Sequence, residues 1–192
     1  MAMPAPWPRC GVVACTADDA LARTFASWVD GLPANAASRT KGAVSWHAAA
    51  HGLVALAKVR PPEARARLPK VAAHSQWQAR LYAARAAAEL KDTAMLRVLA
   101  RDTDDTVKEA AIDALSKLTG HLDDSIYLAA LNASGAQAVR AAAIALKGSP
   151  RADTRVAAEI MFDRWAMRAN ASERDVRVAL LEAAGRPATS VF

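Results

Sequence analysis

An apolar stripe at helical spacing recurs in four separate segments of this chain and limits what it can fold into. Counted from Ala79, Val107, Val139 and Val176, apolar residues stand at the third, fourth and seventh following positions in every case. This is the pattern of a helix buried along one side. The four starting residues lie 28, 32 and 37 positions apart, a range typical of stacked helix pairs with loops of unequal length. The sequence therefore predicts a repeat.

Composition favours helices throughout the chain. Of its 192 residues 50 are alanine, only 5% are aromatic, and alternating apolar and polar runs are absent. Alanine is a strong helix former, and strands have little to build on here. We expect an all-α fold, an α-solenoid of about five stacked antiparallel helix pairs, over these segments: 16–33 with 42–59, 63–74 with 75–90, 92–100 with 104–120, 123–131 with 134–148, and 151–167 with 172–185. Within 63–74, Pro69 is expected to interrupt the helix.

Four regions follow from this reading: an irregular N-terminal arm over 1–15, a capping helix pair over 16–60, the repeats over 61–186, and a C-terminal tail or linker over 187–192. The arm holds three prolines and no basic start, which disfavours a secretory signal. Its Cys10 and Cys15 match no zinc spacing and are read as two thiols, with a disulfide as the alternative. No apolar run has the length of a membrane span, and we take the cytoplasm as the default location.

The residues around the stripes resemble HEAT repeats, particularly the short bacterial HEAT-like form. In that form the second helix carries a Val-Arg anchor followed by paired alanines and a leucine. The resemblance covers about 62–186, and the acidic turn often found between the family's two helices is matched by Asp102, Asp104 and Asp105, and by Asp175. The junctions at 75–78 and 135–138 lack that acid. The resemblance implies a curved stack with a concave binding face, often fused to another domain.

A basic residue directly follows each of the four starting positions, namely Arg80, Lys108, Arg140 and Arg177. The simplest interpretation is a structural ladder in which these cations meet the acids of adjacent turns. A ladder that binds a ligand is the alternative.

Positive charge is concentrated in the segment 58–101, which holds ten basic residues against three acids. Clustered lysine and arginine can release counterions from phosphates, so this segment is a candidate nucleic-acid footprint. A solvated basic face is the competing interpretation. Together with the ladder it defines a candidate binding surface: Arg65, Arg67, Lys70, Trp77, Arg80, Lys108, Arg140 and Arg177.

Other chemistry is weakly indicated. His47 and His51 have a spacing that can chelate a metal, but they are expected to be ordinary helix histidines. Trp77 and Trp165 could stack on bases, although large core residues are the more usual outcome at helical spacing. We find no phosphate loop, nucleophile elbow or catalytic triad pattern. We therefore predict no catalytic residue, metal site or cofactor.

Two functional classes stay open. The first is a noncatalytic protein-interaction scaffold, which is what the resemblance to HEAT repeats implies. The chain is then either one region of a larger protein or ends in a tail, Val191 and Phe192, that packs back on the last helices. The second is a DNA-binding or DNA-repair protein resembling the HEAT-like alkylpurine DNA glycosylases, which would use the basic segment. An acid beside an aromatic residue is needed for such an enzyme, and Asp163 near Trp165 is the local pairing of that kind.

Overall fold

The computed structural model describes residues 12–33, 44–168 and 173–187, and within these ranges it is helical, with no strand. The all-α prediction is confirmed for this part of the chain. The helices are α1 (Val12–Asp30), α2 (Trp46–Val59), α3 (Pro61–Ala72), α4 (Trp77–Glu89), α5 (Thr93–Leu99), α6 (Asp105–Thr119), the 3₁₀ turn η1 (Gly120–Asp123), α7 (Asp124–Ala130), α8 (Ala136–Leu146), α9 (Ala152–Ala166) and α10 (Arg174–Ala183).

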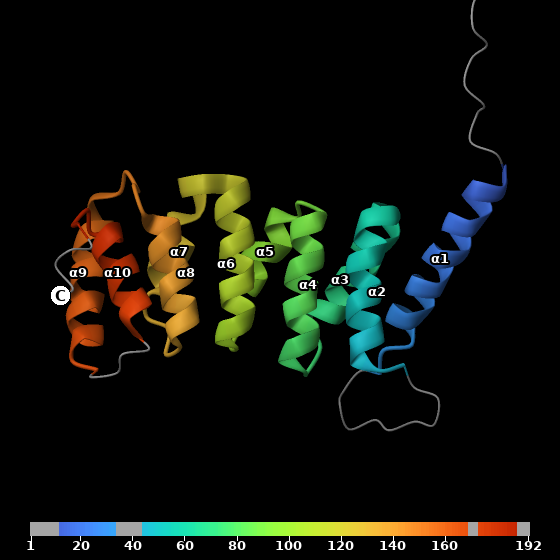
Figure 1. Cartoon of the computed structure of the whole chain (residues 1–192), viewed down its shortest axis with the longest axis horizontal. Coiled ribbons are helices and arrows are strands. Elements are labelled where there is room, and N and C mark those ends of the chain that lie inside the picture. The colour runs from blue at the N-terminus through green and yellow to red at the C-terminus, as the bar shows by residue number, and fades with distance from the viewer. Residues whose placement is uncertain (1–11, 34–43, 169–172, 188–192) are drawn as a thin grey trace, which may run out of the picture.

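The helices form two rows (Figure 1). In the first row α2, α4, α6, α8 and α10 pack side by side in chain order, with α1 against α2 at one end. Helices α3, α5, α7 and α9 lie in the second row, where each packs on the first-row helix that follows it in the chain. This packing is consistent with a helical repeat arrangement, because each pair meets its neighbours along the chain.

The core runs between the rows and is rich in alanine. In α4 the stripe residues Ala79, Ala83, Ala86 and Ala87 are fully buried, and in α6 Val107, Ala111 and Leu115 are fully buried as well. Alanine side chains let neighbouring helices approach closely, while larger residues such as Tyr127 and Trp165 fill the remaining space. Most of the stripe residues expected from the sequence are therefore buried, but Tyr82, Ala110 and Ala114 are only partly buried and Leu118 is exposed.

The structure corrects the expectation at Pro69. Helix α3 runs without a break through this proline, whose ring is exposed. Arg67 and Lys70 on either side of it bind the end of α1, with Arg67 Nε 2.9 Å from Asp30 Oδ1 and Lys70 Nζ 2.7 Å from the Asp30 carbonyl. These tertiary contacts offset the one helical hydrogen bond that proline cannot make.

The boundaries at the two ends differ from those expected or lie outside the described residues. Helix α1 begins at Val12, four residues before the expected Thr16. Most of the arm, including Cys10, and the last five residues of the tail lie outside the described residues.

Gly52 allows α1 to lie close against α2. A Cβ at this position would stand 3.2 Å from the Phe25 carbonyl oxygen and 3.4 Å from the Trp28 ring. Glycine is unfavourable inside a helix, so its place here is explained by the close approach. The contact holds Phe25 and Trp28 beside α2, where they line the hollow described next.

Candidate interaction face

No other described helix covers one side of the first row (Figure 1). We call this side the row face: the surface of α2, α4, α6, α8 and α10 turned away from α3, α5, α7 and α9. Three hollows lie along it, with volumes of 470 Å³ between α1, α2 and α4, 360 Å³ between α4 and α6, and 220 Å³ between α8 and α10. No residue of α3, α5, α7 or α9 lines any of them. The row face is thus grooved at its α2–α4, α4–α6 and α8–α10 joints.

The 470 Å³ hollow combines aromatic walls with basic groups at its edges. Phe25 and Trp28 of α1 contact each other, with ring centroids 5.6 Å apart. On α4 the Tyr82 hydroxyl lies 3.2 Å from Nε2 of His51, and the two rings meet edge to face. Val54, Ala55, Lys58 and Arg85 complete the lining, which contains no carboxylate. An apolar or aromatic group attached to an anion fits this combination.

Arg85 connects the first two hollows, since it lines both. Its guanidinium carbon lies 4.7 Å from the centre of the Tyr82 ring, a cation–π contact. Among the described residues no hydrogen bond or ion pair occupies its N–H groups. An arginine that contacts an aromatic ring and has free donors is well suited to bind a carboxylate from another molecule.

Acidic side chains gather farther along the row face, on α6. Burial raises the pKa of Asp113, although the charges of Lys117 and Arg140 act in the opposite direction. Burial also raises the pKa of Glu109, one helical turn away, and the charge of Asp113 adds to this effect. Asp113 lines the 360 Å³ hollow together with Lys117 and Leu118. The row face therefore changes from basic and aromatic at α2–α4 to mixed charge at α6–α8.

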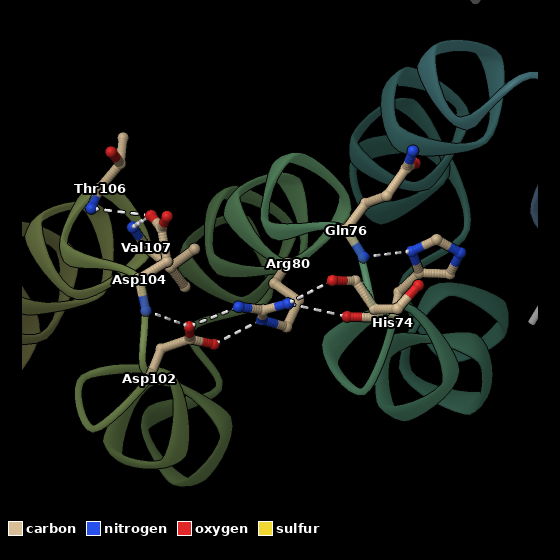
Figure 2. A network of polar contacts seen from close by, with 8 residues as sticks. His74, Gln76, Arg80, Asp102, Asp104, Thr106 and Val107 are labelled. Atoms are coloured by element: carbon tan, nitrogen blue, oxygen red, sulfur yellow. Dashed lines mark hydrogen bonds and ion pairs between the residues drawn. The ribbon is translucent and has the colours of Figure 1, made fainter. Parts of the chain in front are cut away.

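Arg80 shows what the basic ladder does at its first position (Figure 2). Its guanidinium donates two hydrogen bonds to the Asp102 carboxylate, from Nε at 2.7 Å and from Nη2 at 2.8 Å. The remaining Nη1 donates to the carbonyls of His74 and Ser75 at 2.9 and 3.1 Å. Both charged side chains are mostly buried, with exposures of 15% and 8%. Arg80 thus joins two consecutive helix pairs and is not a surface group.

The other ladder positions are not equivalent to Arg80. Lys108 binds Asp105 of its own helix at 2.7 Å. Arg177 is partly buried, whereas Arg140 is exposed and lines the 220 Å³ hollow. Arg80, Lys108 and Arg177 are the fourth residues of their helices, but Arg140 is the fifth of α8. This difference only reflects where each helix begins, because all four residues directly follow a buried stripe residue.

The basic segment 58–101 is largely neutralised within the fold. Arg67 forms a paired contact with Asp30, and Lys70 donates to the carbonyls of Val29 and Asp30. Arg65 donates to the Leu90 carbonyl at 2.5 Å and lies 3.6 Å from Asp92. Four further cations form ion pairs: Lys58 with Glu89, Arg60 with Asp19, Arg80 with Asp102, and Arg97 with Asp123. Arg101 donates a hydrogen bond to the Arg97 carbonyl. Most of its cations therefore hold helices together, and Arg85 and Lys91 are the members with no such partner among the described residues.

The tryptophans and histidines divide between core and surface. Trp165 is buried, with Arg168 stacked over its ring at 4.2 Å, while Asp163 is exposed. Trp77 is 38% exposed. His47 and His51 are both exposed, and no group of three or more metal-ligating side chains occurs among the described residues. Asp163 and Trp165 therefore do not form an acid–aromatic site.

Sequence reasoning missed Tyr82 and Arg85 as a surface pair. Tyr82 was assigned to the buried stripe, but it lies at the edge of the stripe and is only partly buried. The signal available in the sequence was the spacing of the two residues. Arg85 follows Tyr82 by three positions, and residues three apart lie on the same side of a helix.

Comparison of this chain with protein-family models, with curated proteins and with solved structures gives no match. In the part of the chain that the structure describes, no helix is long and apolar enough to cross a membrane.

Proposed function

We propose that this chain is a noncatalytic protein-interaction module, built as a HEAT-like α-solenoid, whose row face binds a protein partner. The observation that carries the proposal is the series of hollows between consecutive first-row helices. A row of parallel grooves on one uncovered side offers repeated contact points to a single extended partner.

The character of the row face supports a protein partner. Partly exposed aromatic side chains and a free arginine lie beside apolar floor residues at the α2–α4 end, and aromatic residues and arginine are enriched at protein interfaces. Exposed Ile144 and partly buried Val178 add apolar side chains to the charged Arg140, Asp175 and Glu182 at the α8–α10 end.

The nucleic-acid alternative has less support. A footprint for phosphates needs free cations on one surface, and in this fold Arg65, Arg67, Lys70 and Arg80 bind carbonyls or carboxylates of the chain itself.

Site-specific photo-crosslinking in the native host tests the proposal. Benzoylphenylalanine is introduced at Ile144 or Val178 on the row face, and at Val98 or Val156 on second-row helices as matched exposed controls. We expect discrete, protease-sensitive adducts from the first two positions only. Equal adducts from both sides, or none from the row face, would contradict the proposal, and nuclease-sensitive adducts would favour the alternative.

A further inference from the structure

We propose that the α2–α4–α6 part of the row face binds an acidic peptide segment of a partner protein. This segment carries two bulky apolar side chains about three residues apart, with a carboxylate between them that binds Arg85. The inference rests on the proposed function and specifies the chemistry of the partner.

The position of Arg85 identifies the charge of the partner. It lies between two hollows, and its guanidinium is held against Tyr82 at 4.7 Å. Arginines elsewhere in the segment, such as Arg67 and Arg80, are paired with carboxylates of this chain. Arg85 lacks such a partner among the described residues, so its donors are available to an incoming carboxylate. The cation–π contact with Tyr82 restricts the guanidinium before binding and so reduces the ordering cost of binding.

The hollows on either side of Arg85 are lined mainly by apolar side chains. The first presents Phe25, Trp28, Val54 and Ala55, and the second presents Ala88, Ala110, Ala114 and Leu118. With volumes of 470 and 360 Å³, both have room for a leucine or an aromatic side chain. Burial of such a side chain supplies about 1.5–3 kcal/mol of the driving force for association.

The spacing of the hollows sets the spacing of the ligand's apolar residues. The two hollows occupy successive joints of the row, α2–α4 and α4–α6. Packed helices lie about 8–10 Å apart, and a peptide in the polyproline II conformation advances about 3.1 Å per residue with three residues per turn, so residues three positions apart point to the same side. Two side chains three positions apart therefore reach both hollows while the residues between them cross α4 beside Arg85.

The other charges near the hollows agree with an acidic ligand. His51 and Lys58 line the first hollow, where no carboxylate occurs; Lys58 is 3.4 Å from Glu89. In the second hollow Asp113 is accompanied by Lys117. A ligand that is basic throughout would place positive charge beside Arg85, and the first hollow has no carboxylate to offset the repulsion.

Selection from a random peptide library displayed on phage, with the intact chain as target, tests this inference. We expect enriched peptides to carry aspartate or glutamate between two bulky apolar residues three positions apart. Synthetic copies should bind the Arg85→Gln variant about tenfold more weakly, as expected for loss of one charge-assisted contact. Arg155→Gln removes the same charge from an exposed site on α9 and should leave binding unchanged.

Two further variants locate the peptide. Ala55→Trp fills the first hollow and Ala114→Trp the second, so each should weaken binding, and each should lose its preference for one of the two apolar residues. Unaltered thermal unfolding shows that a variant is folded. The inference is overturned if the native chain enriches no more peptides than the Arg85→Gln variant does. It is also overturned if the enriched peptides share no acidic residue. Crosslinks from Ile144 and Val178 would then still support the proposed function, and their loss would reject it separately.

Discussion

His74 and Asp102 occupy equivalent positions before consecutive first-row helices, and Arg80 binds both residues. Each stands three residues before its helix, α4 or α6, and accepts a hydrogen bond from the backbone N–H two positions later. The distances are 3.1 Å from Gln76 N to His74 Nδ1 and 2.8 Å from Asp104 N to Asp102 Oδ1. The histidine ring therefore replaces the acid that the 75–78 junction lacks. Its Nε2, at 2.9 Å from the Pro33 carbonyl, also reaches the turn that follows α1.

Replacing Arg80 by methionine should destabilise the chain by about 3 kcal/mol. The substitution keeps most of the side-chain volume but leaves the Asp102 carboxylate, which is 8% exposed, without its guanidinium. Urea denaturation followed by circular dichroism measures the change. Arg85→Met serves as the control, because Arg85 is exposed and makes no ion pair with the described residues; its effect should stay within about 0.5 kcal/mol. Equal losses in the two variants would contradict the buried role of Arg80.

The same pair has a defined pH dependence. Burial acts to raise the pKa of Asp102, but hydrogen bonds from Arg80 and Asp104 N–H, with the charges of Arg80 and Lys108, lower it below 3.8. A carboxyl with a lowered folded pKa stabilises the fold above its unfolded pKa, and this contribution is lost as pH falls through the folded value. The stability difference between the native chain and Arg80→Met should therefore shrink below about pH 4. A difference that stays constant to pH 2 would rule out this linkage.

His74→Asp should be tolerated better than His74→Ala. Aspartate can accept the Gln76 N–H as Asp102 accepts that of Asp104, whereas alanine leaves the part-buried Gln76 N–H and Pro33 carbonyl without the imidazole as partner. An unpaired buried polar group costs about 1–3 kcal/mol. Thermal unfolding of the two variants at neutral pH provides the comparison. If both lose the same stability, the equivalence of His74 and Asp102 has no energetic basis.

Much of the helical framework could be predicted from sequence because its signals are local. The spacing of Val107, Ala111 and Leu115 marks a buried face, and Asp104 before α6 caps its N-terminus, accepting from Thr106 N and Val107 N at 3.0 and 3.2 Å. Pro69 was misjudged because its tolerance depends on contacts with α1, which is distant in sequence.

The candidate site could not be predicted in the same way, because it depends on which cations are already paired. Arg67 and Arg85 look alike in the sequence, yet one is bound to Asp30, 37 positions away, and the other is free among the described residues. Charge counting treats them equally. Only the packing of α3 against the end of α1 separates a structural cation from an available one.

Gly135→Ala should destabilise the α7–α8 junction. A Cβ at this position would stand 2.9 Å from Cβ and Cγ of Asp105 and would displace its carboxylate. That carboxylate accepts from Gly135 N at 2.5 Å and from Ser134 Oγ at 3.2 Å, and so links α6 to the next helix pair. In an Asp105→Gly background neither the carboxylate nor the Cβ of residue 105 remains to be displaced. A double-mutant cycle should show strong coupling, and additive losses would contradict this account.

Asp113→Asn should stabilise the chain at neutral pH. Burial raises the folded pKa of Asp113 above 3.8 despite Lys117 and Arg140, so at any pH above that folded value the charged carboxylate opposes folding. Protonation removes this cost, and the advantage of asparagine should disappear as pH falls below about 4. Chemical denaturation at pH 7 and at pH 3 tests both parts. Destabilisation by asparagine at pH 7 would show that the nearby cations outweigh burial.

Ala111→Asp should be among the most damaging single changes in the chain. Ala111 lies at the centre of α6 and is fully buried, and the first-row helices α4 and α8 both pack against α6. A carboxylate placed there has no partner in the stripe, and an unpaired buried charge costs about 3–5 kcal/mol. Ala66→Asp introduces the same side chain at an exposed position of α3 and should change stability little. Circular dichroism melting compares the two, and an unchanged midpoint for Ala111→Asp would show that the stripe is assigned to the wrong side of the helix.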